Sequence, residues 1–317
     1  MLEALLLVVG FVVLIKGADI FVNASVGIAT KLKIPKVIIG LTIVAMGTSA
    51  PEAVISITAS IKGSNALAIS NVVGSNIFNL MFIMGLCAMI KPLNIDVRQI
   101  AKDFWLSISA AAALVGLKFI GGSHIPRWGS LILLIAFITY LITLIRYSIK
   151  VHGDSDDPSG DPGDGAVKSR PLPLIIVFAL LGCALIVAGG QLVVSNATLI
   201  AIALGVSERI IGITIVAIGT SLPELVTSLV ACKKGENEFA LGNIIGSNIF
   251  NIMFILGIAG LISPLEYENA LVFDTVFLVV GSLISLVFVY TRKRLSRIEG
   301  LVMTLMYIGY ITFILIH

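Results

Sequence analysis

The long apolar runs of this sequence limit its possible folds more than any other feature does. Ten such runs follow one another, and each reaches the roughly 20 residues with which a helix crosses about 30 Å of hydrocarbon. Backbone polar groups in lipid must be satisfied internally, so only helices or a closed barrel can span a membrane. Barrel strands alternate polar and apolar residues, whereas these runs are continuous. Because only 12% of the residues are charged, against about 25% in soluble domains, the sequence predicts an all-α polytopic membrane protein.

The chain also repeats itself at a constant offset of 172 residues. The stretch Gly40–Glu52 matches Gly212–Glu224 at 10 of 13 positions, and Asn71–Asn79 matches Asn243–Asn251 at 7 of 9. Each copy holds five apolar runs, an odd number, so the second copy must enter the membrane from the opposite side. Inverted repeats of this kind are typical of transporters, whose binding site lies between the repeats near the bilayer midplane. The predicted fold is therefore ten transmembrane helices in two inverted five-helix repeats.

A polar segment divides the two copies. We expect a first five-helix repeat at residues 1–150, a cytoplasmic acidic linker at 151–171 and a second five-helix inverted repeat at 172–317. The linker has almost no apolar residues to bury, which is typical of disorder. Its aspartates do not fit an EF-hand loop, because Ser159 and Gly165 stand where the glycine and the bidentate glutamate are required. The expected spans cover residues 2–31, 36–62, 65–90, 99–119, 126–149, 172–203, 208–232, 238–262, 270–291 and 297–316.

Lysine and arginine residues are distributed unevenly over the loops between these runs. If the N-terminus lies outside, 16 of the 21 basic residues fall on the inner side and four on the outer side, with Lys16 inside the first span. The positive-inside rule therefore predicts a multi-pass protein of the plasma or inner membrane with both termini outside. Lys16 and Asp19 lie one turn apart on the first span, and we expect them to pair with each other.

Glu52 and Glu224 lie deep inside apolar runs, whereas most other acidic residues lie at segment ends or in the linker. A charged side chain at the bilayer centre costs roughly 3 kcal/mol even on the lenient insertion scale, so it indicates a functional role. As repeat equivalents the two glutamates are expected to approach each other, and two anions in a low dielectric repel unless protonated or bridged by cations. A protonated pair with a structural role is the alternative, but it does not explain the polar residues gathered around the two glutamates.

Each glutamate follows a short polar motif that a proline interrupts. Hydroxyl side chains stand four and three residues before it, on the same face of a helix. Pro51 removes the ladder hydrogen bond to the carbonyl of Gly47, so the helix is expected to break and to offer free carbonyl oxygens. A single motif of this kind would be weak evidence for a binding site, but its duplication in both copies is strong evidence. The hydroxyl residues are Thr48 and Ser49 in the first copy and Thr220 and Ser221 in the second.

The following run completes the predicted cage. Asn71, Ser75 and Asn79 are four residues apart and form a polar stripe with a twin in the second copy, at Asn243, Ser247 and Asn251. Gly74 and Gly246 within the stripes would permit close backbone approach. Hydrogen bonding between helices is the alternative role, chiefly for Asn71, Asn76, Asn243 and Asn248. We take Ser75, Asn79, Ser247 and Asn251 as candidate metal ligands.

All these candidate ligands are oxygens, which decides the class of ion. The three histidines lie in loops or at the end of the chain, and no cysteine is duplicated at a repeat position, so zinc or copper is not expected. Calcium accepts six to eight oxygens in irregular geometry, whereas magnesium demands an octahedron. Two carboxylates neutralise one Ca²⁺, and the same cage could hold sodium. We expect a carrier rather than an enzyme, with Ca²⁺, Na⁺ and the lipid bilayer as partners, and no cofactor, nucleic acid or protein partner is implied.

With these motifs the chain resembles the cation/calcium antiporter superfamily, which includes sodium/calcium exchangers. The resemblance covers nearly the whole chain, and its motifs are Gly47–Glu52 with Gly74–Asn79 and Gly219–Glu224 with Gly246–Asn251. It implies that Glu52 and Glu224 bind Ca²⁺ directly while spans 1 and 6 slide across a fixed core. Potassium-dependent relatives tend to carry Asp at the position of Asn251, so the amide here argues against potassium co-transport. The implied sodium-site residues are Thr48, Ser49, Thr220, Ser221, Ser75, Ser247 and the carbonyls of Ala45 and Ala217.

The favoured function is antiport of calcium for sodium by alternating access, but alternatives stay open. A calcium/proton antiporter would use the same site, because a glutamate pair binds protons as readily as metal ions. A potassium-dependent exchanger is less favoured. A passive cation channel would show flux without coupling, and a non-transporting scaffold would be indifferent to loss of Glu52.

Overall fold

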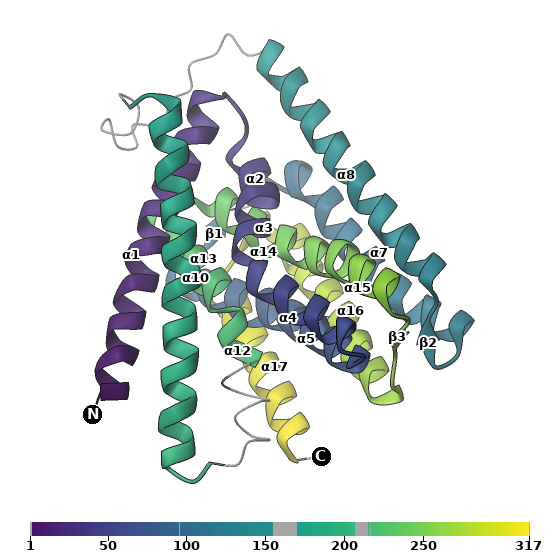
Figure 1. The fold of residues 1–317 in the computed structure, drawn as a ribbon. Helices are drawn as coiled ribbons and strands as arrows, with labels where there is room; N and C mark the ends of the chain where they lie inside the picture. The colour runs from purple at the N-terminus through teal and green to yellow at the C-terminus, as the bar shows by residue number, and fades with distance from the viewer. Residues whose placement is uncertain (1, 95, 155–169, 207–214, 216, 317) are drawn as a thin grey trace.

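The protein is described here by a computed structural model, and it is almost entirely helical (Figure 1). Within the described residues, eight helices are long and apolar enough to cross a membrane, and a ninth candidate is the bent pair Lys36–Thr48 and Ala50–Ile61. The prediction of an α-helical multi-pass membrane protein is confirmed. The expected span at 208–232 lies partly outside the described residues, as does most of the linker. The structure describes residues 2–94, 96–154, 170–206, 215 and 217–316.

The first half of the chain is built from long helices and two interrupted ones. The interrupted helices contain π-helical stretches, labelled η, in which the backbone hydrogen bonds lengthen by one residue. The elements are α1 (Leu2–Lys31), α2 (Lys36–Ile39), η1 (Gly40–Val44), α3 (Ala45–Thr48), α4 (Ala50–Ile61), α5 (Asn65–Ile77), η2 (Phe78–Ile83), α6 (Met84–Ile90), β1 (Leu93–Asn94), α7 (Val97–Gly121), β2 (His124–Ile125) and α8 (Arg127–Asp154).

The second half repeats these elements at nearly constant spacing. The starts of α12 to α16, including η4 and β3, lie 172 residues after their counterparts in the first half, so the sequence repeat is also a repeat of local structure. The elements are α10 (Leu172–Ala203), α12 (Ala217–Thr220), α13 (Leu222–Lys234), α14 (Asn237–Ile249), η4 (Phe250–Ile255), α15 (Leu256–Ile262), β3 (Leu265–Glu266), α16 (Asn269–Arg292), β4 (Arg294–Leu295) and α17 (Arg297–Ile316).

Two continuous spans form the centre of the molecule. They are α5–η2–α6 and α14–η4–α15, and their most apolar stretches are 72% and 83% buried, against 22–39% for the other long spans. Helices that cover both central spans come from the opposite half of the chain: α17 packs on α6 and η2, and α8 packs on α15 and η4. Each half therefore completes the packing of the other half.

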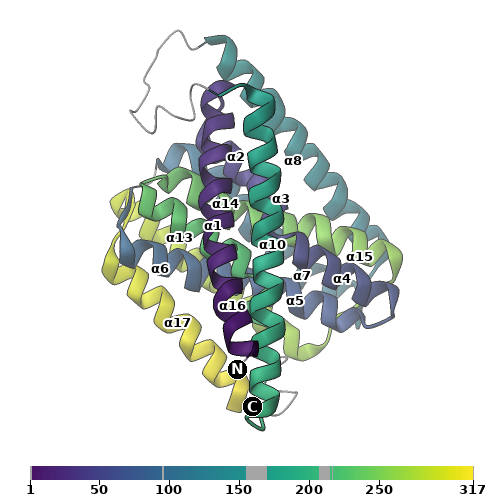
Figure 2. The ribbon, with the colours of Figure 1, turned by 60° about the vertical axis from the view of Figure 1, so that its left-hand side comes forward.

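Helices α1 and α10 lie side by side along one edge of the molecule and run in opposite directions (Figures 1 and 2). Glycines allow their backbones to touch: a Cβ on Gly17 would lie 2.8 Å from the nitrogen of Ile186, and one on Gly189 would lie 2.5 Å from the nitrogen of Leu14. Small residues at such interfaces permit the close packing that holds helices together in lipid. The pair therefore packs as one unit.

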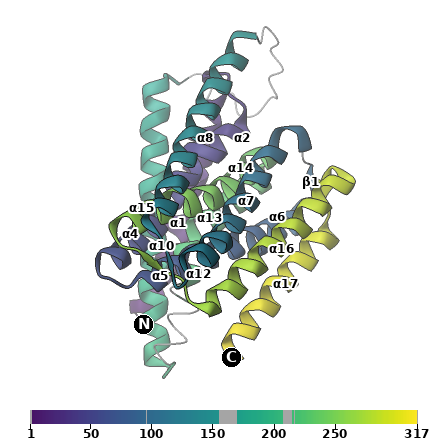
Figure 3. The same cartoon turned by 90° about the vertical axis from the view of Figure 1, so that its right-hand side faces the viewer.

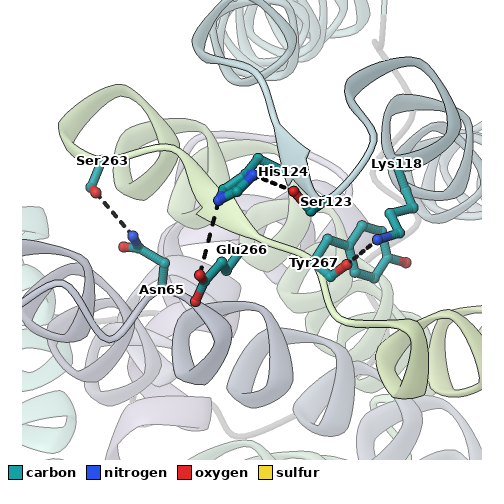
Figure 4. A network of polar contacts seen from close by, with 7 residues as sticks. All are labelled: Asn65, Lys118, Ser123, His124, Ser263, Glu266 and Tyr267. Carbon is teal, nitrogen blue, oxygen red and sulfur yellow. Dashed lines mark hydrogen bonds and ion pairs between the residues drawn. The ribbon is translucent and has the colours of Figure 1, made fainter.

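Short antiparallel strand pairs also link the two halves. Leu93 in β1 pairs with Leu295 in β4, and Ile125 in β2 pairs with Leu265 in β3. Near the second pair, Asn65 donates a 2.9 Å hydrogen bond to Ser263, as Figure 4 shows. The end of α7 and the start of α8 flank β2, and α16 begins just after β3 and runs beside α7, with α17 next to it (Figure 3).

The expected pairing of Lys16 with Asp19 is wrong. Asp19 instead forms an ion pair of 2.6 Å with Lys234 at the end of α13, and Lys234 also bonds the side chain of Asn23. Lys16 lies on an exposed face of α1. Spacing along one helix made the local pair possible, but the packing of α1 on α13 brings a basic partner from the other half.

Candidate functional site

A helix break places each central glutamate at the start of a new helix. Helix α3 ends at Thr48 and α4 begins at Ala50, with a bend of 51° between the two segments. Ser49, at the break, has left helical geometry with φ −82° and ψ 9°, and Ser221 repeats it with φ −91° and ψ 8°. Proline follows each break in the first turn, where its missing N–H costs nothing. The predicted break is confirmed, and the carbonyl of Gly47 now accepts a contact from the thiol of Cys183 at 3.8 Å.

Each glutamate is held by the serine of the opposite repeat. Ser221 donates a 2.8 Å hydrogen bond to Oε1 of Glu52, and Ser49 donates one of 2.7 Å to Oε1 of Glu224. Both glutamates are fully buried. Because Ser49 precedes Glu52 by only three residues, these reciprocal bonds bring the two carboxylates together between the repeats.

Several buried oxygens on the two glutamates and on the central spans have no hydrogen-bond partner among the described residues. Leaving such an atom unpaired costs about 1–3 kcal/mol, so native proteins do so rarely and where a ligand or another function requires it. The atoms occur in repeat-equivalent pairs, which a random packing fault would not produce. They are Oε2 of Glu52 and Glu224, Oγ of Ser75 and Ser247, and Oδ1 of Asn79 and Asn251.

The threonines and alanines of the predicted cage lie on the two short helices before the breaks. Thr48 donates to Oδ1 of Asn243 at 3.1 Å and approaches the carbonyl of Ala45 at 3.3 Å. Thr220 is buried at the end of α12, which begins at Ala217. The structure thus places all twelve predicted residues on the paired elements α3–α4 and α12–α13 and on the two central spans.

Two serines that hold the asparagine stripes were not predicted from the sequence. Asn71 donates to Ser56 and Asn243 donates to Ser228, each at 2.9 Å. Ser56 and Ser228 stand four residues after the two glutamates, on the same helix face, and they are repeat equivalents. Their helical spacing and duplication are the signals that could have found them.

The site contains two carboxylates and, among the described residues, no lysine, arginine or histidine that forms an ion pair with either of them. In the same part of the chain, no three or more His, Cys, Asp or Glu side chains lie together so that they could hold a metal ion. Serine hydroxyls donate hydrogen bonds to both Glu52 and Glu224. Such an arrangement of carboxylate, hydroxyl and amide oxygens suits hard cations rather than soft metals.

Comparisons with known proteins agree on one family. Residues 2–146 and 174–316 match the model described as "Sodium/calcium exchanger protein". The putative antiporter CaxA of Alkalimonas amylolytica is 37% identical over 98% of both chains. The sodium/calcium exchanger MaX1 of Methanosarcina acetivorans is 35% identical over 97% of both chains. Solved structures of the sodium-calcium exchanger NCX_Mj superpose with a TM-score of 0.83 at 31% identity, over 98% of both chains.

Proposed function

Because this chain belongs to the sodium/calcium exchanger family, we propose that it exchanges calcium for sodium across the membrane by alternating access, with both ions bound between Glu52 and Glu224. Exchange of cations that include calcium follows from the family. The sodium coupling and the location of the site are the proposal.

One observation carries this proposal: six buried oxygens have no partner among the described residues, two of them on the reciprocally bonded glutamates and four on the central spans that pack against α4 and α13. They come from Glu52, Ser75, Asn79 and their repeat equivalents. Calcium takes six to eight oxygen ligands, and two carboxylates balance its charge. Sodium ions entering the same oxygens in place of calcium would couple the two fluxes, because both cannot occupy one set of ligands at once.

The proposed architecture is ten membrane helices in two inverted repeats, with both termini outside. Both chain termini lie at one end of the molecule, and the end of α8 and the start of α10 lie at the other (Figure 1). This arrangement is the one that five spans per half require. The basic residues favour placing the end with both termini outside, because 16 of 21 would then face the cytoplasm.

An outward sodium gradient should drive calcium uptake into proteoliposomes that contain the protein. If several sodium ions leave for each calcium that enters, net positive charge moves outward, and an inside-positive potential should speed uptake. Each elementary charge contributes about 2.3 kcal/mol per 100 mV. We would measure ⁴⁵Ca²⁺ uptake with sodium, potassium and proton gradients imposed one at a time. Uptake driven by the proton gradient and indifferent to sodium would instead establish calcium/proton antiport.

Acidification should inhibit calcium uptake by raising the calcium concentration needed for half-maximal rate. A proton and Ca²⁺ compete for the same carboxylate oxygens of Glu52 and Glu224, so each protonation removes charge that holds the metal. The rate at subsaturating calcium should therefore fall from pH 8 to pH 5, and saturating calcium should restore part of it. A rate that stays flat across this range would contradict a carboxylate site.

A further inference from the structure

Four buried asparagines form a hydrogen-bonded cluster where the two central spans cross. We call Asn76, Asn79, Asn248 and Asn251 the asparagine clasp; each is at most 1% exposed. Asn76 donates to the backbone carbonyl of Asn248 at 3.1 Å, and Asn248 donates to the carbonyl of Asn76 at 3.3 Å. These two reciprocal bonds fix both side-chain amides against the opposite helix.

The fixed amides in turn hold the other two asparagines. Asn79 donates to Oδ1 of Asn248 at 3.3 Å, and Asn251 donates to Oδ1 of Asn76 at 3.0 Å. Each half of the chain therefore orients one asparagine of the other half. Asn76 and Asn248 each use both ends of their amide within the clasp.

This arrangement fixes which end of the Asn79 and Asn251 amides takes part in the clasp and which end does not. Their NH₂ groups are engaged in the clasp, whereas their Oδ1 atoms have no partner among the described residues. Ser75 and Ser247 precede them by four residues, about one helical turn, and their Oγ atoms are also buried without a partner. An amide can turn over at no cost in shape, so only its hydrogen bonds decide whether oxygen or NH₂ faces a given side.

We propose that Asn76 and Asn248 are positioning residues for cation binding: Asn248 keeps the oxygen of Asn79 available to the ion, and Asn76 does the same for Asn251. This inference rests on the proposed function, because it concerns the same site. A cation attracts an amide oxygen and is repelled by an amide NH₂. Loss of the clasp partner would let the amide turn over and would weaken binding without removing any ligand.

A pair of double-mutant cycles tests the proposal on the full-length protein in liposomes. Asn248→Leu should raise the calcium KM about 10-fold or more while the maximal rate changes little, as for other residues that orient a metal ligand. In the Asn79→Asp background the same change should raise KM by no more than about twofold. An aspartate presents an oxygen whichever way it turns, so it no longer needs Asn248. Asn248→Ala is the second variant if the leucine variant does not purify as a monodisperse protein.

The crossed pairing gives a matched control within the same cluster. Asn251→Asp should rescue Asn76→Leu, whereas Asn79→Asp should not, because Asn76 holds Asn251 and not Asn79. Asn65→Ala removes a hydrogen bond between the halves outside the clasp and should leave KM unchanged. The proposal would be overturned if Asn248→Leu raised KM equally with asparagine and with aspartate at position 79, or if Asn79→Asp rescued Asn76→Leu as well as Asn251→Asp does. If the wild type takes up no calcium, or if Glu52→Gln takes it up normally, the proposed function fails and the clasp with it.

Discussion

Glutamine at position 52 or 224 is expected to reduce calcium uptake to the level of empty liposomes. Ca²⁺ would lose one of the two carboxylates proposed to balance its charge, and among the described residues no third His, Cys, Asp or Glu joins them to form a metal-holding group. Folding should survive, because the amide oxygen of glutamine can still accept the hydrogen bond of Ser221 or Ser49. Removing one of two adjacent buried anions also relieves their repulsion. Thermal unfolding of each variant in detergent should therefore occur at a temperature no lower than that of the wild type.

The matched control is Glu268→Gln, which removes a carboxylate of the same kind from an exposed position before α16. It should transport calcium at the wild-type rate, as should substitutions in the acidic linker. The experiment also separates the remaining alternatives. A scaffold would show no flux to lose, and a passive channel would retain flux without any imposed counter-ion gradient. Normal calcium uptake by either glutamine variant would refute the central site.

Much of the fold could be predicted from the sequence because lipid imposes simple rules. The lengths of the apolar runs gave spans such as 65–90 and 172–203 to the residue, since hydrophobic thickness fixes helix length. The bend near Pro51 followed from a missing backbone donor. The π-helical stretches η2 and η4 were not predicted, because no residue type marks them; only their repetition in equivalent positions is visible afterwards.

Partners across the repeat could not be predicted from spacing. Ser49 shares a helix face with Glu52 in the sequence, yet it bonds Glu224, because the break at Ser49 ends the helix on which that face was defined. The predicted partner of Asp19 was wrong for the same reason, since its actual partner, Lys234, lies 215 residues away in the sequence. Local periodicity identifies which polar residues share a helix face that points into the protein. Tertiary packing alone decides which of them meet.

The asparagine stripes show a finer limit of the same kind. Both ion ligation and bonding between helices were open for these amides. In the structure Asn76 and Asn248 bond across the helices with both ends of the amide, while the oxygens of Asn79 and Asn251 have no partner in the described part of the chain. All four share one residue type and one repeated motif, so sequence cannot separate the two roles. The orientation of an amide depends on which donors and acceptors surround it in the folded protein.

Helix α14 approaches η1 so closely that one glycine should decide whether the two elements pack together. A Cβ on Gly246 would lie 2.6 Å from Cα and 2.7 Å from the carbonyl oxygen of Leu41, and 2.9 Å from Cβ of Ala45. Two of these atoms belong to the backbone of η1 and cannot move without displacing that element. The close approach expected at Gly246 is confirmed. At Gly74 no described atom lies within 4 Å of an added Cβ, and Ile213, the repeat equivalent of Leu41, lies outside the described residues.

Gly246→Val is therefore expected to destabilise the protein by about 3 kcal/mol or more, at the upper end of what overpacking a core costs. The variant should yield little monodisperse protein in size-exclusion chromatography, and what folds should melt at a lower temperature. Gly309→Val is the control: Gly309 lies within α17, is exposed, and has no described atom within 4 Å of its added Cβ. That variant should purify and melt like the wild type. Equal behaviour of the two valine variants would mean that α14 and η1 do not approach each other as closely as the backbone contacts at Gly246 require.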